Sequence, residues 1–259
     1  MKWTSRIALG AAFAASLAAV TPAMADLKIG LAAEPYPPFA SQDATGKWVG
    51  WEIDFADALC AEVKEKCEIV PTAWDGIIPA LTAGQIDAIM ASMSITEERM
   101  QTIDFSDKYY NTPAMVMVAA DSAITPDAAG LTGKIVGVQI STTHEAYTQK
   151  YFGPVASEVK IYQTQDEANQ DLAAGRVDAV MADSIALQAF LDSDAGKACC
   201  KSAGMVAGDP EILGAGVGFG LRQGDPLKDK LNAAIAAIRA DGTYAAITAN
   251  YFAFDVYGE

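Results

Sequence analysis

Two groups of hydroxyl and charged side chains have the spacing needed to bind an anionic group. In the first, Ser94 and Glu97 have the spacing of a helix capping box, and Thr96 and Arg99 fall in the same predicted turn. A helix N-terminus with hydroxyls and a nearby Arg suits a carboxylate or a phosphate. Ordinary capping with a solvent-exposed Arg99 would produce the same pattern.

The second group lies at residues 141–145, where Thr142 and Glu145 repeat the capping spacing. It predicts a second helix N-terminus, directed to the place where a ligand-binding cleft would lie. This group also contains His144, the single histidine of the chain. His144 fits two interpretations equally well: a residue of the cap turn that faces water, or a ligand contact.

The elements that must position these groups are marked by a repeat. The segment 81–99, LTAGQIDAIMASMSITEER, returns in altered form at 172–187 as LAAGRVDAVMADSIAL. Each copy is typical of a helix end, a glycine cap at Gly84 or Gly175, and a short apolar strand. Ligands bind beyond the carboxyl ends of strands in open α/β sheets, so the polar residues after each strand, among them Asp183, predict two similar lobes facing one cleft. A duplicated packing unit without function is the alternative.

The remaining pattern predicts that the first domain is split in sequence and that the second domain is inserted into it. One copy of the repeat falls in each domain. Apolar runs predict strands, among them 27–32, 135–139 and 158–162, and 3.6-residue periodicity predicts helices, among them 227–240. A Gly-rich apolar segment at 211–220 is predicted to be a strand that returns across a hinge. The predicted domains are 26–112 with 214–259 as lobe 1, and 113–213 as lobe 2.

Residues 1–25 have the features of a cleaved signal peptide. Lys2 and Arg6 form a basic start, residues 7–20 are apolar, and an Ala-Met-Ala site precedes Asp26. No cysteine lies near the cut, and no second long apolar segment follows. We expect export to the periplasm as a soluble protein, with secretion to the medium as the alternative.

Charge narrows the classes of partner. The net charge of −15 becomes −17 once the signal peptide and its two cations are removed. An acidic surface argues against nucleic acid and anionic membranes, and it is compatible with cationic or zwitterionic solutes. Solubility alone would also explain it. The chain has no G-x-S-x-G elbow, metal-ligand cluster or phosphate loop.

Four cysteines become eligible for disulfides after export. Cys60 falls near the end of a predicted helix and Cys67 at the start of the next strand, so a short local bridge is reasonable. A metal site is a weak rival because the chain has one histidine. For the adjacent Cys199 and Cys200, two thiols, a vicinal bond and an intermolecular link all remain open.

Across the mature chain the sequence resembles solute-binding protein family 3, the periplasmic proteins of polar amino acid ABC uptake systems. This group includes lysine/arginine/ornithine-, histidine- and octopine-binding proteins. The motifs that carry the resemblance are Gly-Trp-Glu-Ile-Asp at 50–54, Trp-Asp-Gly-Ile-Ile-Pro at 74–79, Ser-Ile-Thr at 94–96 with Arg99, Asp-Phe-Ser at 104–106 and Asp-Gly-Thr at 241–243.

The resemblance implies an α/β, two-lobed periplasmic binding protein fold of type II, with a mixed sheet flanked by helices in each lobe and a two-strand hinge. It implies a monomer that needs no cofactor or metal. The protein would capture a polar amino acid, with a basic one or an opine favoured, by hinge closure. It would deliver this ligand to an inner-membrane ABC permease and its ATPase.

The resemblance also implies roles for individual residues. Arg99 would hold the ligand α-carboxylate through a bidentate pair, helped by backbone amides near Ser94 and Thr142. Asp183 would accept the α-ammonium, and Ser92 would share it. The pairing of Cys60 with Cys67 matches the disulfide of the family.

Two aromatic residues would hold the ligand side chain between them. Tyr36 and Trp74 suit an aliphatic or guanidinium group, although Trp74 could instead belong to the core. In basic amino acid binders an acid just before the Tyr meets the distal charge, and here Glu34 lies near that place in a loop one residue longer. The predicted ligand-binding set is completed by Met93, Gln139, Thr143 and His144.

An enzyme on the same scaffold is the second hypothesis. A dehydratase acting on cyclic prephenate-like acids resembles this family in fold, and Glu34 or His144 would supply its general acid or base. A binding protein without enzymatic activity remains the leading interpretation.

Overall fold

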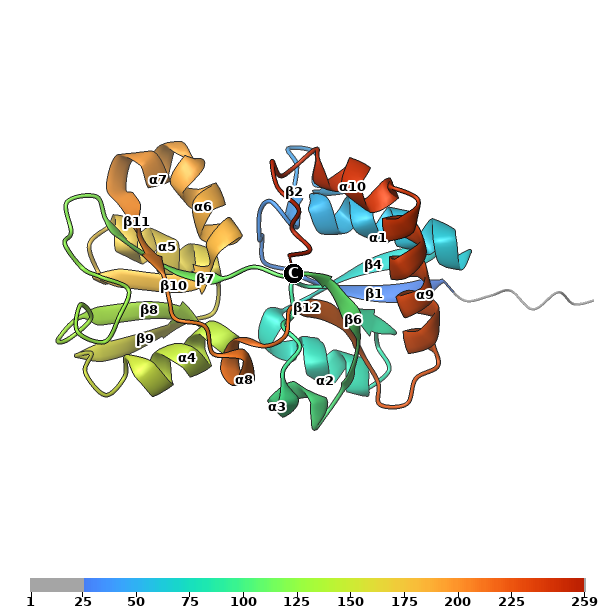
Figure 1. Ribbon diagram of the computed structural model, residues 1–259, viewed down its shortest axis with the longest axis horizontal. Helices are drawn as coiled ribbons and strands as arrows, with labels where there is room; N and C mark the ends of the chain where they lie inside the picture. The colour runs from blue at the N-terminus through green and yellow to red at the C-terminus, as the bar shows by residue number, and fades with distance from the viewer. Residues whose placement is uncertain (1–25, 259) are drawn as a thin grey trace, which may run out of the picture.

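The chain folds into two lobes of similar construction. The computed structural model describes residues 26–258, and Figure 1 shows one lobe on each side of a narrow junction. The predicted signal peptide lies outside these residues. Within this range no helix has the length and apolarity needed to cross a membrane.

Each lobe contains one mixed sheet of five strands, and a two-stranded ribbon (β2, β3) joins the first lobe. The strand order is β4-β1-β5-β12-β6 in the first lobe and β9-β8-β10-β7-β11 in the second, so the two orders are equivalent. The strands are β1 Leu27–Ala32, β2 Ser41–Gln42, β3 Trp48–Val49, β4 Cys67–Thr72, β5 Ala88–Ile89, β6 Asp104–Tyr110, β7 Ala114–Ala119, β8 Ile135–Gln139, β9 Glu158–Tyr162, β10 Ala179–Asp183, β11 Cys200–Met205 and β12 Val217–Leu221.

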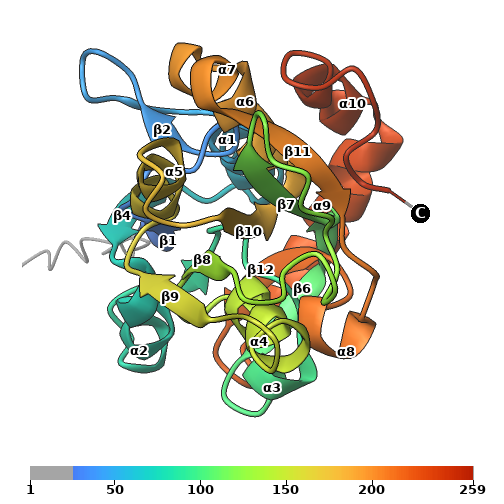
Figure 2. The same cartoon turned by 90° about the vertical axis from the view of Figure 1, so that its left-hand side faces the viewer.

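Helices cover both faces of each sheet. In the first lobe α1, α9 and α10 pack on one face and α2 on the other. In the second lobe, which faces the viewer in Figure 2, α4 and α8 cover one face and α5, α6 and α7 the other. The helices are α1 Trp51–Val63, α2 Ile77–Thr82, α3 Glu97–Met100, α4 Thr143–Tyr151, α5 Gln165–Ala173, α6 Ser184–Asp192, α7 Asp194–Cys199, α8 Pro210–Leu213, α9 Leu227–Ala240 and α10 Thr243–Thr248, with a 3₁₀ turn, η1, at Trp74–Gly76.

The chain crosses between the sheets twice. It leaves the first sheet after β6, enters the second at β7, and returns between β11 and β12. The second lobe is thus an insertion between β6 and β12, which are antiparallel neighbours in the first sheet. The predicted two-lobed α/β architecture is confirmed.

The sequence repeat corresponds to equivalent structure in the two lobes. Gly84 and Gly175 end their helical segments with left-handed φ values of 71° and 69°. In each copy an Asp side chain, Asp87 or Asp178, then accepts a backbone amide near the start of the neighbouring strand, from Lys28 of β1 at 3.0 Å or Ile135 of β8 at 2.8 Å. The short strands β5 and β10 follow, parallel to β1 and β8.

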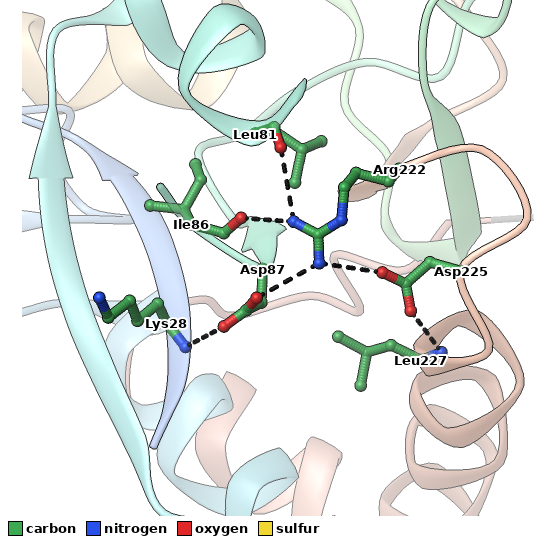
Figure 3. A network of polar contacts seen from close by, with 7 residues as sticks. All are labelled: Lys28, Leu81, Ile86, Asp87, Arg222, Asp225 and Leu227. Carbon is green, nitrogen blue, oxygen red and sulfur yellow. Dashed lines mark hydrogen bonds and ion pairs between the residues drawn. The ribbon is translucent and has the colours of Figure 1, made fainter. Parts of the chain in front are cut away.

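Arg222 fixes the first copy to the end of β12 (Figure 3). Its guanidinium donates to the carbonyl of Ile86 at 2.7 Å and to the carboxylates of Asp87 at 3.2 Å and Asp225 at 3.1 Å. Asp225 also accepts the amide of Leu227 at the start of α9. This network ties β5, β12 and α9 together on the first lobe.

An aromatic cluster fills the first lobe between α1 and β6. Trp51 stacks on Phe55 with ring centroids 5.1 Å apart, and Phe55 stacks on Tyr109 at the same separation. Tyr244 of α10 meets Trp51 edge-on at 5.6 Å. Burial of these large rings stabilises the lobe and fixes the start of α1, where Glu52 follows Trp51.

Two local predictions are wrong. Ser94 does not cap a helix, because it forms an isolated bridge with Val217 and the chain is still extended there. The helix begins at Glu97, and Thr96 is its N-cap. The predicted strand at 211–220 begins only at Val217, because Asp209 caps the short helix α8 before it.

The cysteines form two disulfides. Cys60 at the end of α1 is bonded to Cys67 at the start of β4, with their Cα atoms 6.1 Å apart, which confirms the predicted pair. Of the alternatives open for Cys199 and Cys200, the structure has the vicinal bond, between α7 and β11.

Candidate functional site

A cavity lies between the two lobes. The first lobe supplies the loop after β1, η1 and the segment around α3, and the second supplies the end of β8 and the starts of α4 and α5. Ten of the twelve residues predicted to bind ligand line it: Glu34, Tyr36, Trp74, Ser92, Ser94, Arg99, Gln139, Thr142, Thr143 and His144.

An adjoining cavity extends toward the hinge. It shares Tyr36, Ser92 and His144, among others, with the first cavity, and it adds Asp183. One oxygen of Asp183 caps α6 by accepting the amides of Ile185 at 2.8 Å and Ala186 at 3.3 Å. The other oxygen accepts the hydroxyl of Thr112 on the hinge segment.

Met93 was predicted to bind ligand, but it lines neither cavity. Its side chain is 1% exposed and packs in the apolar cluster between α2 and the first sheet. Its neighbours Ser92 and Ser94 line the cavity, whereas Met93 packs into this cluster. Met93 is therefore a core residue rather than a cavity residue.

Arg99 lies at the boundary between the lobes. It donates to the carbonyl of Ser94 at 2.9 Å in its own lobe and to the carbonyl of Ser141 at 3.1 Å in the other. Each terminal nitrogen keeps a second N–H, so the fork retains donors for a carboxylate. Burial lowers its pKa to about 10, which leaves it cationic at neutral pH.

The N-terminus of α4 opens into the cavity from the second lobe. Thr142 is its N-cap and accepts the amide of Glu145 at 3.0 Å, as predicted. The Glu145 carboxylate accepts the amide of Ser141 at 2.6 Å. Because first-turn amides have no intrahelical acceptor, those of Thr143 and His144 remain available to an anionic group.

Trp74 and Glu34 form the wall on the first lobe. The Glu34 carboxylate accepts the amide of Trp74, at 3.2 Å for the nearer oxygen. The indole Nε1 donates across the cleft to the carbonyl of Ile140 at 2.9 Å. The Arg99 guanidinium lies 5.6 Å from the Trp74 ring centroid. The indole therefore lines the cavity and is not only a core side chain.

Glu52 is a cavity residue to which the sequence analysis gave no role. It is 1% exposed and accepts the Tyr109 hydroxyl at 2.5 Å and the Ser92 amide at 2.8 Å. Burial, opposed by these hydrogen bonds, raises the pKa of Glu52 to about 7. The available signal was an acid inside the apolar face of a predicted helix.

Ser92 carries the one buried side-chain oxygen or nitrogen without a hydrogen-bond partner in the described part of the chain. Its backbone is left-handed, with a φ of 52°, and the hydrogen bond from its amide to Glu52 supports that conformation. A buried hydroxyl without a partner loses free energy, so a polar ligand group in the cavity would stabilise it.

His144 is neutral at physiological pH. Burial, together with the neighbouring Arg99 charge, lowers its pKa to about 4. Gln165, a second cavity residue that was not predicted, stands at the first position of α5. Its burial together with Ala168, Asn169 and Leu172 follows helical spacing, and that spacing was readable in the sequence.

Comparison with known proteins gives consistent matches over the chain. The model of bacterial extracellular solute-binding proteins, family 3, matches residues 27–254. The L-arginine-binding protein of Pseudomonas aeruginosa is 43% identical over 98% of this chain and 98% of its own length. The histidine-binding periplasmic protein of Salmonella typhimurium is 42% identical over 98% of this chain and 99% of its own.

A solved structure agrees with these matches. An ancestral arginine-binding protein bound to arginine has a TM-score of 0.79 and 36% identity, covering 88% of this chain and 98% of its own. These relatives are amino-acid-binding proteins, and the resemblance drawn from the motifs is confirmed. The chain therefore belongs to the bacterial extracellular solute-binding proteins of family 3.

Proposed function

We propose that this protein captures a basic amino acid or a related opine in the periplasm and delivers it to an inner-membrane ABC permease. It acts as a binding protein and not as an enzyme. The observation that carries this proposal is the meeting of Arg99 and the α4 N-terminus, from opposite lobes, at one cavity. Both are built to hold a carboxylate.

The acidic residues around the cavity support a cationic ligand. Glu34 and Glu52 line the main cavity, and Asp183 lines the adjoining one. With the α-carboxylate on Arg99, the α-ammonium would lie near Asp183 and Ser92. The side chain would then extend between Tyr36 and Trp74 toward the carboxylates. The names of the two matched relatives, an arginine- and a histidine-binding protein, fit this assignment.

Hinge closure supplies the signal to the permease. A ligand that touches Arg99 on one lobe and the α4 amides on the other stabilises the closed state by its differential contacts. The permease and its ATPase would recognise that state. Export through the predicted signal peptide would place the protein on the correct side of the membrane.

Titration of ligand-stripped protein tests the proposal. Calorimetry with arginine, lysine, ornithine, histidine and octopine should give saturable binding of at least one of them. Intrinsic Trp fluorescence should change in parallel, because Trp74 lines the cavity. The absence of binding across this panel would overturn the proposal.

Turnover provides the second measurement. The purified protein is expected to leave prephenate and arogenate unchanged over hours, since a ligand held by Arg99 and Asp183 needs no chemistry to be delivered. Conversion of either compound, abolished by Glu34→Gln or His144→Gln, would replace the binding proposal with the dehydratase.

A further inference from the structure

Two buried carboxamides face the cavity from the second lobe. Gln139, 8% exposed, is the last residue of β8, and Gln165, 7% exposed, is the first residue of α5. Both line the main cavity together with Glu34 and Glu52 of the first lobe. In the proposed function neither carboxamide holds the α-carboxylate or the α-ammonium.

The amide nitrogens of both residues are already used by the protein. Gln139 Nε2 donates to the carbonyl of Gln163 at 3.1 Å, and because a carbonyl only accepts, this contact fixes the orientation of the amide. Gln165 Nε2 donates to Oδ1 of Asn169 at 2.9 Å, one helical turn further along α5. Asn169 is itself 6% exposed.

This arrangement leaves an acceptor oxygen on each carboxamide. Within residues 26–258 no hydrogen bond reaches Oε1 of Gln139 or Oε1 of Gln165. The opposite wall contributes the carboxylates of Glu34 and Glu52. The two carboxylates and the two carboxamides therefore present oxygen acceptors to the cavity.

We infer that Gln139 and Gln165 form an acceptor pair that selects a ligand with a guanidinium group over one with an ammonium group or a urea. The inference rests on the proposed function and names the ligand class of that site. A guanidinium carries five N–H donors in one plane and can serve acceptors on two walls at once. An ammonium is a compact donor without a planar fork, so it matches acceptors on two walls less well, and the urea oxygen of citrulline would face an acceptor.

The test compares three ligands on four forms of the mature protein. Arginine, lysine and citrulline are titrated calorimetrically into wild type, Gln139→Met, Gln165→Met and Gln170→Met. The control Gln170 lies in the same helix, and its Nε2 also donates to a side chain one helical turn away, that of Asp166, but Gln170 is exposed and outside the cavity. Methionine keeps the side-chain length and removes the acceptor.

We expect wild type to bind arginine at least about 30-fold more tightly than lysine or citrulline. Each cavity variant should weaken arginine about 10- to 100-fold, which is the loss expected when a hydrogen bond to a charged group is removed. Lysine binding should change less than about threefold. Gln170→Met should match wild type with all three ligands.

Asn169 is a positioning residue in this arrangement, and Asn169→Leu provides a separate readout. Without Asn169 the Gln165 amide is no longer held in place. The ratio of arginine affinity to citrulline affinity should therefore decrease, while the affinity for lysine stays unchanged. A merely structural role of Asn169 would lower all three affinities together. Thermal unfolding of each variant identifies any form that fails to fold.

The outcomes separate the two proposals. Equal loss of arginine and lysine in both cavity variants, or wild-type lysine affinity equal to that for arginine, would overturn the acceptor pair and leave amino acid capture intact. Failure of the wild type to bind arginine, ornithine, histidine, octopine or lysine would overturn the proposed function itself.

Discussion

Arg99 is the residue on which the candidate site most depends. Its guanidinium is desolvated and contacts the carbonyls of Ser94 and Ser141, so the remaining donors are directed in advance. Arg99→Ala would leave a bound carboxylate buried without its charged partner, with the α4 amides as its remaining donors. We expect a loss of about 2–5 kcal/mol in binding free energy, measured by calorimetry.

A charge-conserving variant controls for that prediction. Arg99→Lys keeps the cation but lacks the planar fork, and we expect it to bind more weakly than wild type and more tightly than Arg99→Ala. If Arg99→Ala bound within a few-fold of wild type, the carboxylate would lie elsewhere in the cavity.

Glu52 predicts a pH dependence of stability. Its folded pKa of about 7 lies above its ordinary value of 4.5, so the folded state binds the proton more tightly. The stability it contributes is complete below pH 4.5 and is lost as the pH rises toward 7. Relative to wild type, Glu52→Gln should therefore gain about 2–3 kcal/mol in unfolding free energy between pH 5 and pH 8.

Urea denaturation without ligand, at both pH values, measures this difference. Glutamine retains an oxygen for the Ser92 amide and the Tyr109 hydroxyl, so the variant should fold. A constant difference between the two proteins across that range would mean that Glu52 is ionised in the folded state with an ordinary pKa.

His144 acts in the opposite direction. Its folded pKa of about 4 lies below its ordinary value of 6.5, so protonation favours the unfolded chain. Its contribution is present above pH 6.5 and is lost as the pH falls toward 4. His144→Gln should thus lose less stability than wild type between pH 7 and pH 4.5, by about 2 kcal/mol in chemical denaturation. Parallel acid profiles would contradict a buried neutral imidazole.

The helix end that occurs in both copies of the repeat allows a prediction about the stability of one structural element. Gly84 and Gly175 adopt left-handed backbone, and a Cβ at either position would meet no atom within 4 Å. The cost of Gly→Ala is therefore conformational alone, and we expect about 1 kcal/mol of destabilisation at each site.

Gly208→Ala is the matched control, because its surroundings are equally open and its φ lies outside the left-handed region. It should leave the unfolding free energy unchanged or slightly raised. Unfolding in urea compares the three variants. Equal stability of all of them would show that φ at the two caps relaxes without cost.

Elements were predictable where one local signal decided them. β1, β8 and β9 and the helix α9 have the predicted bounds, because apolar runs and clear periodicity define them. The start of α3 was not predictable, because a β-bridge to Val217, which is distant in sequence, keeps Ser94 extended. α7 and β11 follow no strong local pattern, and tertiary pairing with β7 defines the strand.

The same distinction holds for the site. Arg99 and Thr142 were predictable because short motifs name them. The burial of Glu52 and Gln165 was readable from helical spacing, but the cavity that they line depends on how α1 and α5 pack on their sheets. Met93 lies in the apolar cluster with α2 while its neighbours Ser92 and Ser94 line the cavity, and the sequence alone does not show that difference.

At the scale of the whole molecule, two hydrogen bonds from the first lobe cross the cleft to the second lobe. The donors are the Trp74 indole and the Arg99 guanidinium, and both acceptors are carbonyls of one loop, at Ile140 and Ser141. Both bonds join the lobes directly, so they stabilise the arrangement in which the lobes meet, and a ligand that contacts both lobes would add to that stabilisation.

Trp74→Phe should shift the ligand-free protein toward the open form. Phenylalanine keeps an aromatic face for the ligand but cannot donate to Ile140, and a lost hydrogen bond of about 1 kcal/mol changes the open-to-closed ratio about fivefold. Small-angle scattering should show a larger radius of gyration without ligand and recovery at saturation. Trp48→Phe, in β3 and outside the cavity, is the control. Identical scattering of all three proteins without ligand would show that the indole bond does not hold the lobes together.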